Sequence, residues 1–393
     1  MPIIPRIVVL LNSKTYLMYN QIREDVLFII LFSVVTAMAM MSSCYLLFRQ
    51  GNAFATEVTP PVRLRRWTAA FFASIALNHV WYMPIFFLSS SNDIMMIDLI
   101  GGLLDSMTVF PLMIVVLFTM LQDRRRPMWP IAVMFAPIVV GNAWCVVVRS
   151  YALLPMLYLY FLLMCIGLVI YIVRALRQYG RWLRDNYADL EHKEVWQSFV
   201  VLAIILLVFV VYALTNENQI FIYVMLVISA VLICFFLWRV ETLSDLSIPI
   251  QTDEAIPVVG AEETDTTEKV EDNALPLTMR NNIGPLLKQY CEEPQLYLQY
   301  DLTLSQLANL IGTNRLYLSQ HFSSQGMTYN AYINGLRIQH FIRLYHEAAA
   351  THQPVRAQQL AYQSGFRNYN TFNAAFKKIM EMTATEWMQH VKS

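Results

Sequence analysis

The stretch LANLIGTNRLYLSQHF, residues 307–322, decides the fold of the C-terminal third because its pattern occurs again 53 residues later. The second copy is LAYQSGFRNYNTFNAAF, residues 360–376. Each copy begins with Leu-Ala, reaches a glycine after three more residues, and then carries two apolar residues four positions apart. A repeat of this kind indicates that one structural unit is present twice.

The residue types in each copy are typical of a helix-turn-helix unit. A small alanine lets two helices cross closely, and a glycine can take the left-handed conformation that ends the first helix. Two apolar side chains at i and i+4 then hold the second helix and leave its opposite face to solvent. These positions are Ala308, Gly312, Leu318 and Phe322 in the first copy, and Ala361, Gly365, Phe372 and Phe376 in the second.

The outward face of each second helix carries groups that suit DNA. Asn and Gln side chains can form bidentate hydrogen bonds with adenine, and apolar side chains suit the thymine methyl group. The two outward rows are Leu316, Ser319, Gln320 and Ser323, and Asn370, Asn373, Ala374 and Lys377. Cations near helix ends suit phosphate contacts, and here they are Arg315, Arg367, Lys377 and Lys378.

The charge of this region points the same way. Residues 295–393 carry eight Lys and Arg against four Asp and Glu, a net charge of +4. A basic surface is the electrostatic footprint of nucleic-acid binding. The alternative is that the polar rows are ordinary solvated helix faces, but the repeat and the charge together favour binding of double-stranded promoter DNA.

A family resemblance rests on LTLSQLANLIGTNRLYLSQHF, YINGLRI and LAYQSGFRNYNTFNAAFKK. With these motifs, residues 277–393 resemble the DNA-binding domain of AraC/XylS-type transcriptional regulators. The resemblance implies two helix-turn-helix units joined by a long central helix, here about 328–350, and recognition helices that enter successive major-groove segments. Carried over by position, the base-contacting residues are Leu316, Ser319, Gln320, Tyr369, Asn370 and Asn373.

The C-terminal motif of that family departs from its usual form in this chain. The family pattern has Gly, Pro and Arg where this sequence, in EMTATEWM, has Glu381, Ala384 and Met388. Trp387 and Thr383 retain residue types that support packing. The departure removes an arginine that would contact phosphate, so it bears on affinity more than on the fold.

The remainder of the chain has the composition of a membrane protein. Apolar residues make up 57% of the sequence and charged residues 14%, well outside the usual soluble mix. Seven runs with few or no charges exceed the ~20 residues that a helix needs to cross a bilayer. They are 26–48, 67–92, 94–121, 127–148, 150–173, 195–216 and 218–238. The preceding MPIIPRIVVLL lacks a small-residue cleavage site, so we expect no cleaved signal peptide.

We therefore predict an all-α protein, a seven-transmembrane helical bundle followed by a cytoplasmic double helix-turn-helix DNA-binding domain. The predicted domain map is an extracytoplasmic tail at 1–25, the transmembrane domain at 26–240, a linker at 241–275 and the DNA-binding domain at 276–393. The linker has a net charge of −9, with prolines and no periodicity, which is typical of a disordered tether. An alternative role for its acidic run is competition with DNA for the basic face.

The distribution of cations predicts the orientation. The loops at 49–66, 122–127 and 174–194, together with Arg239, hold thirteen Lys and Arg, whereas the other side of the bundle holds four. Positively charged loops stay in the cytoplasm. With seven spans, the N-terminus lies outside and the C-terminus inside, in the inner (cytoplasmic) membrane of a bacterium.

A few polar groups stand out within the spans. Asp98 and Asp105 are seven residues apart and share one helix face, while Asn78 and His79 lie in the preceding span. Ionisable groups at membrane depth are costly and often functional, so these four residues are candidates for a sensing site that takes a small ligand or a proton. The alternative is that they tie helices together by hydrogen bonds.

The function predicted from these parts is that of a membrane-embedded one-component transcriptional regulator whose bundle is the sensor. The alternative is a membrane receptor or transporter with DNA binding as a secondary output. No HExxH, GxSxG or phosphate-loop motif is present, so we expect no enzyme. The five cysteines form no CxxC pair, and we expect no metal and no cofactor. A homodimer is a further expected partner, as is RNA polymerase if the protein activates transcription.

Overall fold

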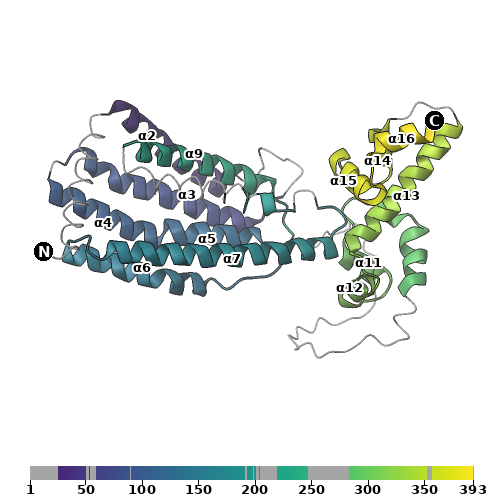
Figure 1. The fold of residues 1–393 in the computed structure, drawn as a ribbon, viewed down its shortest axis with the longest axis horizontal. Helices are drawn as coiled ribbons and strands as arrows, with labels where there is room; N and C mark the ends of the chain where they lie inside the picture. Colours follow the sequence, from purple (N-terminus) through teal and green to yellow (C-terminus); the bar gives the residue numbers. More distant parts are fainter. Residues whose placement is uncertain are drawn as a thin grey trace. The chain divides into compact units, whose positions relative to one another are not determined.

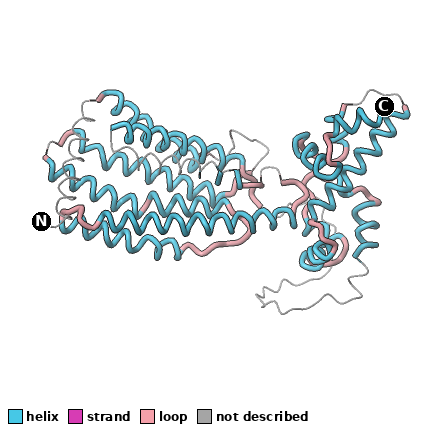
Figure 2. The backbone as a smooth tube through the Cα atoms, viewed as in Figure 1, coloured by secondary structure: helices cyan, strands magenta, loops and turns pink. Residues whose placement is uncertain are grey.

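The structure is a computed structural model that describes part of the chain. The described residues are 25–49, 53, 59–88, 90–190, 193–197, 199–200, 203, 219–246, 283–351 and 356–392. Within them the secondary structure is helical, and Figure 2 shows helices joined by loops without a strand in these ranges. The all-α prediction is confirmed. Two compact units are formed, one by residues 1–179 and 195–249 and the other by 180–194 and 250–393.

The first unit is built from long apolar helices (Figure 1). They are α2 (Val26–Phe48), α3 (Val62–Tyr82) continued by the 3-10 turn η1 (Met83–Phe86), α4 (Ser91–Met107), α5 (Val109–Met120), α6 (Trp129–Val148), α7 (Leu154–Asn186) and α9 (Gln219–Thr242). The side chain of Asp25 caps α2 by accepting hydrogen bonds from the backbone N–H groups of Leu27 and Phe28. Such a cap satisfies donors that the first turn of a helix leaves unpaired.

The predicted span 94–121 is interrupted at Thr108. This residue has φ −123° and ψ −66°, between the end of α4 and the start of α5. Pro111 explains the break, because proline has no N–H to donate and its ring clashes with the carbonyl four residues earlier. The helix resumes at once, since the backbone N of Leu112 bonds the oxygen of Thr108 at 3.0 Å.

The number of spans differs from the prediction. In the described ranges, six helical segments are long and apolar enough to cross a membrane, namely 26–48, 62–86, 91–120, 129–148, 154–186 and 223–242. The predicted count of seven is therefore not reproduced. Most of the segment predicted at 195–216 lies outside the described residues, which accounts for the difference.

Side-chain contacts define the direction of neighbouring helices in the first unit. Helices α2 and α3 are antiparallel, because Thr36 bonds His79 near one end and Ser43 bonds the carbonyl of Ala69 near the other. The same alternation continues through α4, α6 and α7, with bonds that join Trp81 to Ile97, Asn78 to Asp105, Asn142 to Gly102 and Tyr160 to Met134.

Helix α9 breaks this alternation. Its first turns meet the start of α2 where Tyr223 donates to Asp25, and its last turn meets the end of α2 where the Tyr45 hydroxyl donates to Glu241 at 3.0 Å. The two helices therefore run parallel, side by side in Figure 1. Since α7 also runs in the direction of α2, α7 and α9 point the same way.

The second unit contains the predicted pair of helix-turn-helix units. Residues 283–287 are helical and lead into η2 (Lys288–Glu292) and η3 (Leu296–Leu298). The remaining helices are α11 (Leu304–Leu310), α12 (Arg315–Ser324), α13 (Tyr329–Ala350), α14 (Ala357–Gln363), α15 (Tyr369–Met380) and α16 (Ala384–Lys392). The central helix expected near 328–350 is confirmed as α13, and Thr328 caps it.

Each helix-turn-helix unit has its own apolar core, and α13 contributes to both. Tyr329 and Ile333 belong to the first core, whereas Ile338, Phe341 and Tyr345 belong to the second. A single helix that supplies both cores holds the two units at a defined spacing. The residues predicted to face inward, namely Ala308, Leu318, Phe322, Ala361, Phe372 and Phe376, are all buried.

The domain map differs from the prediction at two places. The linker was expected to begin at residue 241, but α9 continues to Thr242, and the backbone N–H groups of Asp245 and Leu246 bond Thr59 and Gln122. Residues 180–194 group with the DNA-binding domain although the prediction assigned them to the transmembrane domain. The remainder of the predicted linker and the tail at 1–24 lie outside the described residues.

Candidate nucleic-acid interface

The first helix-turn-helix unit of the interface consists of α11, a glycine turn and α12. Helix α11 begins with a capping box, in which the Thr303 hydroxyl accepts from the backbone N of Gln306 and the Gln306 side chain accepts from the backbone N of Thr303. Gly312 ends the helix at φ +71°, as the sequence predicted. Asn314 then caps α12 by accepting from the backbone N of Tyr317 at 2.8 Å. These local signals define where the recognition helix starts.

The outward row of α12 lies where the sequence analysis placed it. Leu318 and Phe322 are buried, and the opposite side presents Leu316 with 57% of its surface exposed. Gln320 and Arg315 are exposed and Ser319 is half-buried. An exposed leucine beside an amide and a cation is a suitable surface for thymine methyl, adenine and phosphate groups.

The second unit is α14, a glycine turn and α15. Gly365 has φ +85°, and a β-carbon there would lie 2.7 Å from the Cα of Leu298, so only glycine fits. Asn368 caps α15 by accepting from the backbone N of Asn370 at 2.6 Å. Phe372 and Phe376 anchor the helix in the second core.

The predicted residues of α15 divide into two groups. Asn370, Asn373 and Lys377 follow one another at i, i+3 and i+7, so the structure brings them to one face. Lys378 is exposed next to them. Tyr369 instead stacks on Phe372 with ring centroids 5.6 Å apart and packs against the second core. Part of its ring surface is therefore used in core packing and is not available for a base contact.

One exposed cation of this domain was not considered in the sequence analysis. Arg356 is exposed at the N-cap of α14, where a positive charge opposes the helix dipole. An arginine placed against the dipole, at the helix that precedes a recognition helix, suits a phosphate contact. The unfavourable charge at a helix start was the signal that could have revealed it.

Arg337 is buried between the two helix-turn-helix units and contacts both. It is 1% exposed, and its guanidinium donates to the carbonyls of Tyr297 at 2.7 Å and Gln299 at 2.6 Å. The group also lies 5.6 Å from the centre of the Phe366 ring in the second unit's turn. Burial lowers the pKa of Arg337 to about 10, and the Asp189 carboxylate opposes that shift. Arg337 therefore remains charged near neutral pH.

Two further titratable groups reflect the local packing. Burial, followed by the adjacent Arg343 guanidinium, lowers the pKa of His340, whose Nδ1 lies 3.1 Å from the Tyr297 hydroxyl.

Hydrogen bonds from the backbone and then the side chain of Thr383 lower the pKa of Glu386. Thr383 and Glu386 form the capping box of α16, which keeps this helix in place although the family's proline is replaced.

The predicted sensing residues are brought together only in part. Asn78 donates to Asp105 at 2.7 Å, and the Tyr82 hydroxyl lies 3.4 Å from the other oxygen of this carboxylate. Asp98 accepts a hydrogen bond from Tyr151 at 3.0 Å. His79 faces α2, where it bonds Thr36 at 3.0 Å and stacks on Phe32, so it is not part of the carboxylate group.

Comparison with known proteins assigns a class to the C-terminal region. A family model described as a helix-turn-helix domain matches residues 307–390. The TCP pilus virulence regulatory proteins of two Vibrio cholerae serotype O1 strains, classical and El Tor, are each 32% identical over 76 residues, which cover 19% of this chain and 26% of the relative. The chain thus spans about a quarter of the length of these curated relatives. No solved structure matches it.

The C-terminal domain is therefore a DNA-binding domain of the helix-turn-helix class. Within that class, the match over residues 307–390 and the similarity to a regulatory protein confirm the resemblance to AraC-type transcription regulators for this region.

Proposed function

We propose that this chain is a membrane-embedded one-component transcription regulator, in which the helical bundle senses a signal and the C-terminal domain binds promoter DNA. The observation that carries the proposal is that one chain has six membrane-capable helices among its described residues and two helix-turn-helix units. DNA lies in the cytoplasm, so the C-terminal domain and the end of α9 belong on that side of the inner membrane.

The helix directions support an N-terminus outside. Because α2 runs parallel to α9, residue 25 lies on the side opposite to the end of α9. This direction agrees with the cation distribution, which also predicts an N-terminus outside.

Two of the cation-rich loops, 49–66 and 122–127, meet the segment after α9 at one end of the bundle. Arg65 donates to the carbonyl of Arg49, and Gln122 donates to Ser244 at 2.9 Å. These residues come from the loops that carry most of the arginines and from the segment after α9. The orientation can be tested with reporter fusions after residue 239 and near residue 91. Cytoplasmic activity of the second fusion would contradict it.

For the sensing part, the polar pairs of α4 are the best candidate within the described residues. Asp98 and Asp105 bond partners on neighbouring helices, so a ligand or proton that alters these bonds could shift the helix packing. Asp98→Asn and Asp105→Asn should change promoter output in cells and leave DNA affinity unchanged. If both variants insert normally and regulate normally under every condition tested, the two carboxylates only join helices.

The DNA-binding part can be tested by capture of promoter fragments from cells that express the intact protein. We expect specific fragments to be enriched in the membrane fraction, and their affinity to fall steeply with salt because bound cations are released from the phosphates. If no fragment is enriched, the alternative function of a membrane receptor or transporter would be favoured. Whether the protein acts as a homodimer and contacts RNA polymerase follows from the same captured complexes.

A further inference from the structure

The segment that follows α7 lies against the first helix-turn-helix unit. Tyr187 and Thr303 form an antiparallel β-bridge, and the backbone N of Ala188 bonds the carbonyl of Leu302 at 3.3 Å. The Asn330 side chain donates to the carbonyls of Ala188 at 2.6 Å and Tyr187 at 3.3 Å. These contacts connect residues more than 100 positions apart in the sequence.

Burial shows that one residue of the segment, Ala188, is part of this unit's core. Ala188 is 1% exposed and belongs to the same apolar cluster as Leu302, Leu304 and Ile333. Asp189 is also buried, and its charge counteracts the lowering of the pKa of Arg337. Lys193 closes the segment with an ion pair to Asp301, at 3.6 Å, and its side chain is 9% exposed.

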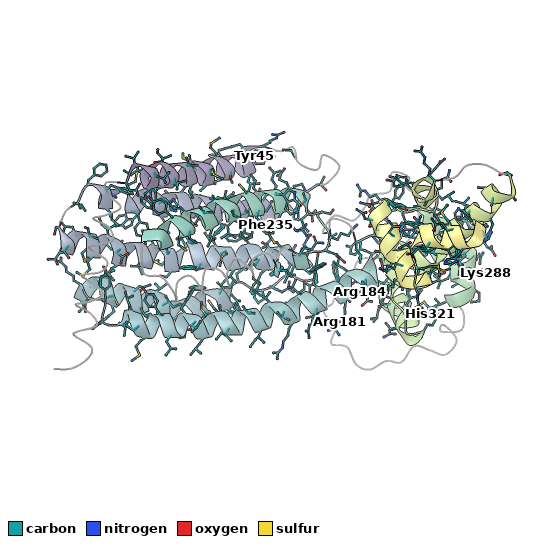
Figure 3. The ribbon with its side chains drawn as sticks, turned by 45° about the horizontal axis from the view of Figure 1, so that its top comes forward. Tyr45, Arg181, Arg184, Phe235, Lys288 and His321 are labelled. Carbon is teal, nitrogen blue, oxygen red and sulfur yellow. The ribbon has the colours of Figure 1, made fainter. Side chains whose placement is uncertain are left out.

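The segment is attached to a helix of the membrane domain. Helix α7 begins in an apolar run and ends at Asn186, one residue before the bridge at Tyr187. The residues of α7 before 180 belong to the compact unit of the bundle. Its last turns, with Arg181 and Arg184 labelled in Figure 3, belong to the compact unit that contains the DNA-binding domain. A helix transmits displacement along its length, whereas a flexible linker sets mainly an effective concentration.

The reading face of the recognition helix is not used by this docking. The contacts involve Asp301, Leu302 and Thr303 before α11, and Asn330 at the start of α13. Leu316 and Gln320 on α12 remain exposed. The docked segment is therefore compatible with bound DNA and suits a role in holding and orienting the domain.

We propose that residues 187–190, together with Lys193, are a docking segment that attaches the first helix-turn-helix unit to the end of α7, so that α7 carries the state of the bundle to the DNA-binding domain. The attachment stands on the contacts alone, whereas its regulatory consequence rests on the proposed function. The acidic linker then serves as a second, covalent connection.

The attachment can be tested in the full-length protein in its membrane by cutting the linker. A specific protease site inserted between 250 and 275 separates the C-terminal domain from the bundle covalently. With the docking segment intact, we expect most of the C-terminal fragment to sediment with the membranes. Ala188→Glu places a charge in the core cluster and should release the fragment, whereas the control Ala349→Glu, at an exposed position near the end of α13, should not.

A cysteine pair gives an independent measurement. The Cα atoms of antiparallel bridged residues lie about 4.5–5.5 Å apart, within the range of roughly 4.4–6.8 Å that a disulfide spans. Tyr187→Cys with Thr303→Cys should therefore keep the cut fragments joined on a non-reducing gel. The control pair, Tyr187→Cys with Ala374→Cys on the exposed face of α15, should not. Release of the unmodified fragment together with no cross-link for the first pair would overturn the proposal.

The regulatory consequence has its own readout. Ala188→Glu should alter promoter output in cells while the protein still binds promoter fragments with unchanged affinity. If the unmodified protein binds no promoter fragment and has no effect on promoter output, this would count against the proposed function, even where the fragment stays with the membrane. Release of the fragment by Ala188→Glu together with normal regulation in that variant would reject α7 as the carrier of the signal.

Discussion

The bundle and the DNA-binding domain use apolar side chains in opposite ways. In the bundle they cover the outside, as on α7, where Leu159 is 57% exposed and Leu163 60% exposed. Its interior includes polar side chains such as Asn78 and Asn142, which bond across helices. In the DNA-binding domain the aromatic rings fill two cores, and the recognition helices turn amides and cations such as Gln320 and Lys377 outward. The difference teaches that the solvent, lipid or water, decides which residues a helix buries.

The largest expected effect comes from removing a core ring of the DNA-binding domain. Phe372 is fully buried and contacts Phe341, Phe366 and Phe376. Phe372→Ala should destabilise this domain by about 3–5 kcal/mol, because it removes apolar contacts and leaves a cavity. Urea denaturation of detergent-solubilised protein, followed through proteolysis of the domain, measures the loss. A change within about 0.5 kcal/mol, as expected for Leu310→Ala at a half-exposed surface position, would contradict the assigned core.

Arginine substitutions at two exposed leucines, one in the bundle and one in the DNA-binding domain, should have very different free-energy costs. Leu159 on α7 is 57% exposed and Leu310 on α11 is 50% exposed. If α7 faces lipid, Leu159→Arg costs about 2.5–3.5 kcal/mol of insertion free energy, whereas Leu310→Arg costs almost nothing in water. The fraction of each variant recovered in the membrane measures the difference. Equal recovery would mean that the outside of α7 does not face lipid.

The two recognition helices should read opposite ends of one footprint. Asn370→Ala or Asn373→Ala should weaken binding by about 1–3 kcal/mol per lost base contact and relax specificity at one end. Gln320→Ala should do so about one DNA turn (~34 Å) away, because α13 separates the two units. Footprinting of each variant checks the positions. Effects at the same base pairs would rule out this arrangement.

Acidification should weaken the DNA-binding domain through His340. Its pKa is lowered in the folded state from an ordinary value near 6.5, so below that pH the unfolded chain binds a proton that the folded domain resists. The stability that His340 contributes is therefore complete above pH 6.5 and is lost as the pH falls. Thermal unfolding between pH 5 and 8 should show this slope, and His340→Gln should reduce it. His346→Gln, at an exposed position of the same helix, should leave the slope intact.

The smallest effect is expected at Glu381, the position where the related family carries glycine. Glu381 has φ +59°, a left-handed conformation that costs a non-glycine residue about 1–2 kcal/mol. Glu381→Gly removes this strain but adds freedom to the unfolded chain, so the net gain should be below about 1 kcal/mol. Glu347→Gly, inside α13, should instead lower stability by about 1 kcal/mol. A loss for both variants would show that the side chain of Glu381 has a stabilising contact.

Much of the DNA-binding surface could be predicted because its signals are local. The glycines of the two turns, the caps before α12 and α15, and the i, i+4 anchors each act within a few residues. Asn370, Asn373 and Gln320 follow from that periodicity. Tyr369 shows the limit, since its stacking on Phe372 depends on how the end of the helix packs and not on its position in the pattern.

The sequence by itself determined that the chain consists of apolar spans followed by a repeated helix-turn-helix, because composition and periodicity over 10–20 residues set local structure. Only the tertiary structure decided that α9 runs parallel to α2, that Arg337 is buried between the two helix-turn-helix units, and that Ala188 belongs to the core of the first one. These features rest on contacts between positions 29 to 198 residues apart. Such contacts leave no period in the sequence, since they depend on which faces meet after the helices have formed.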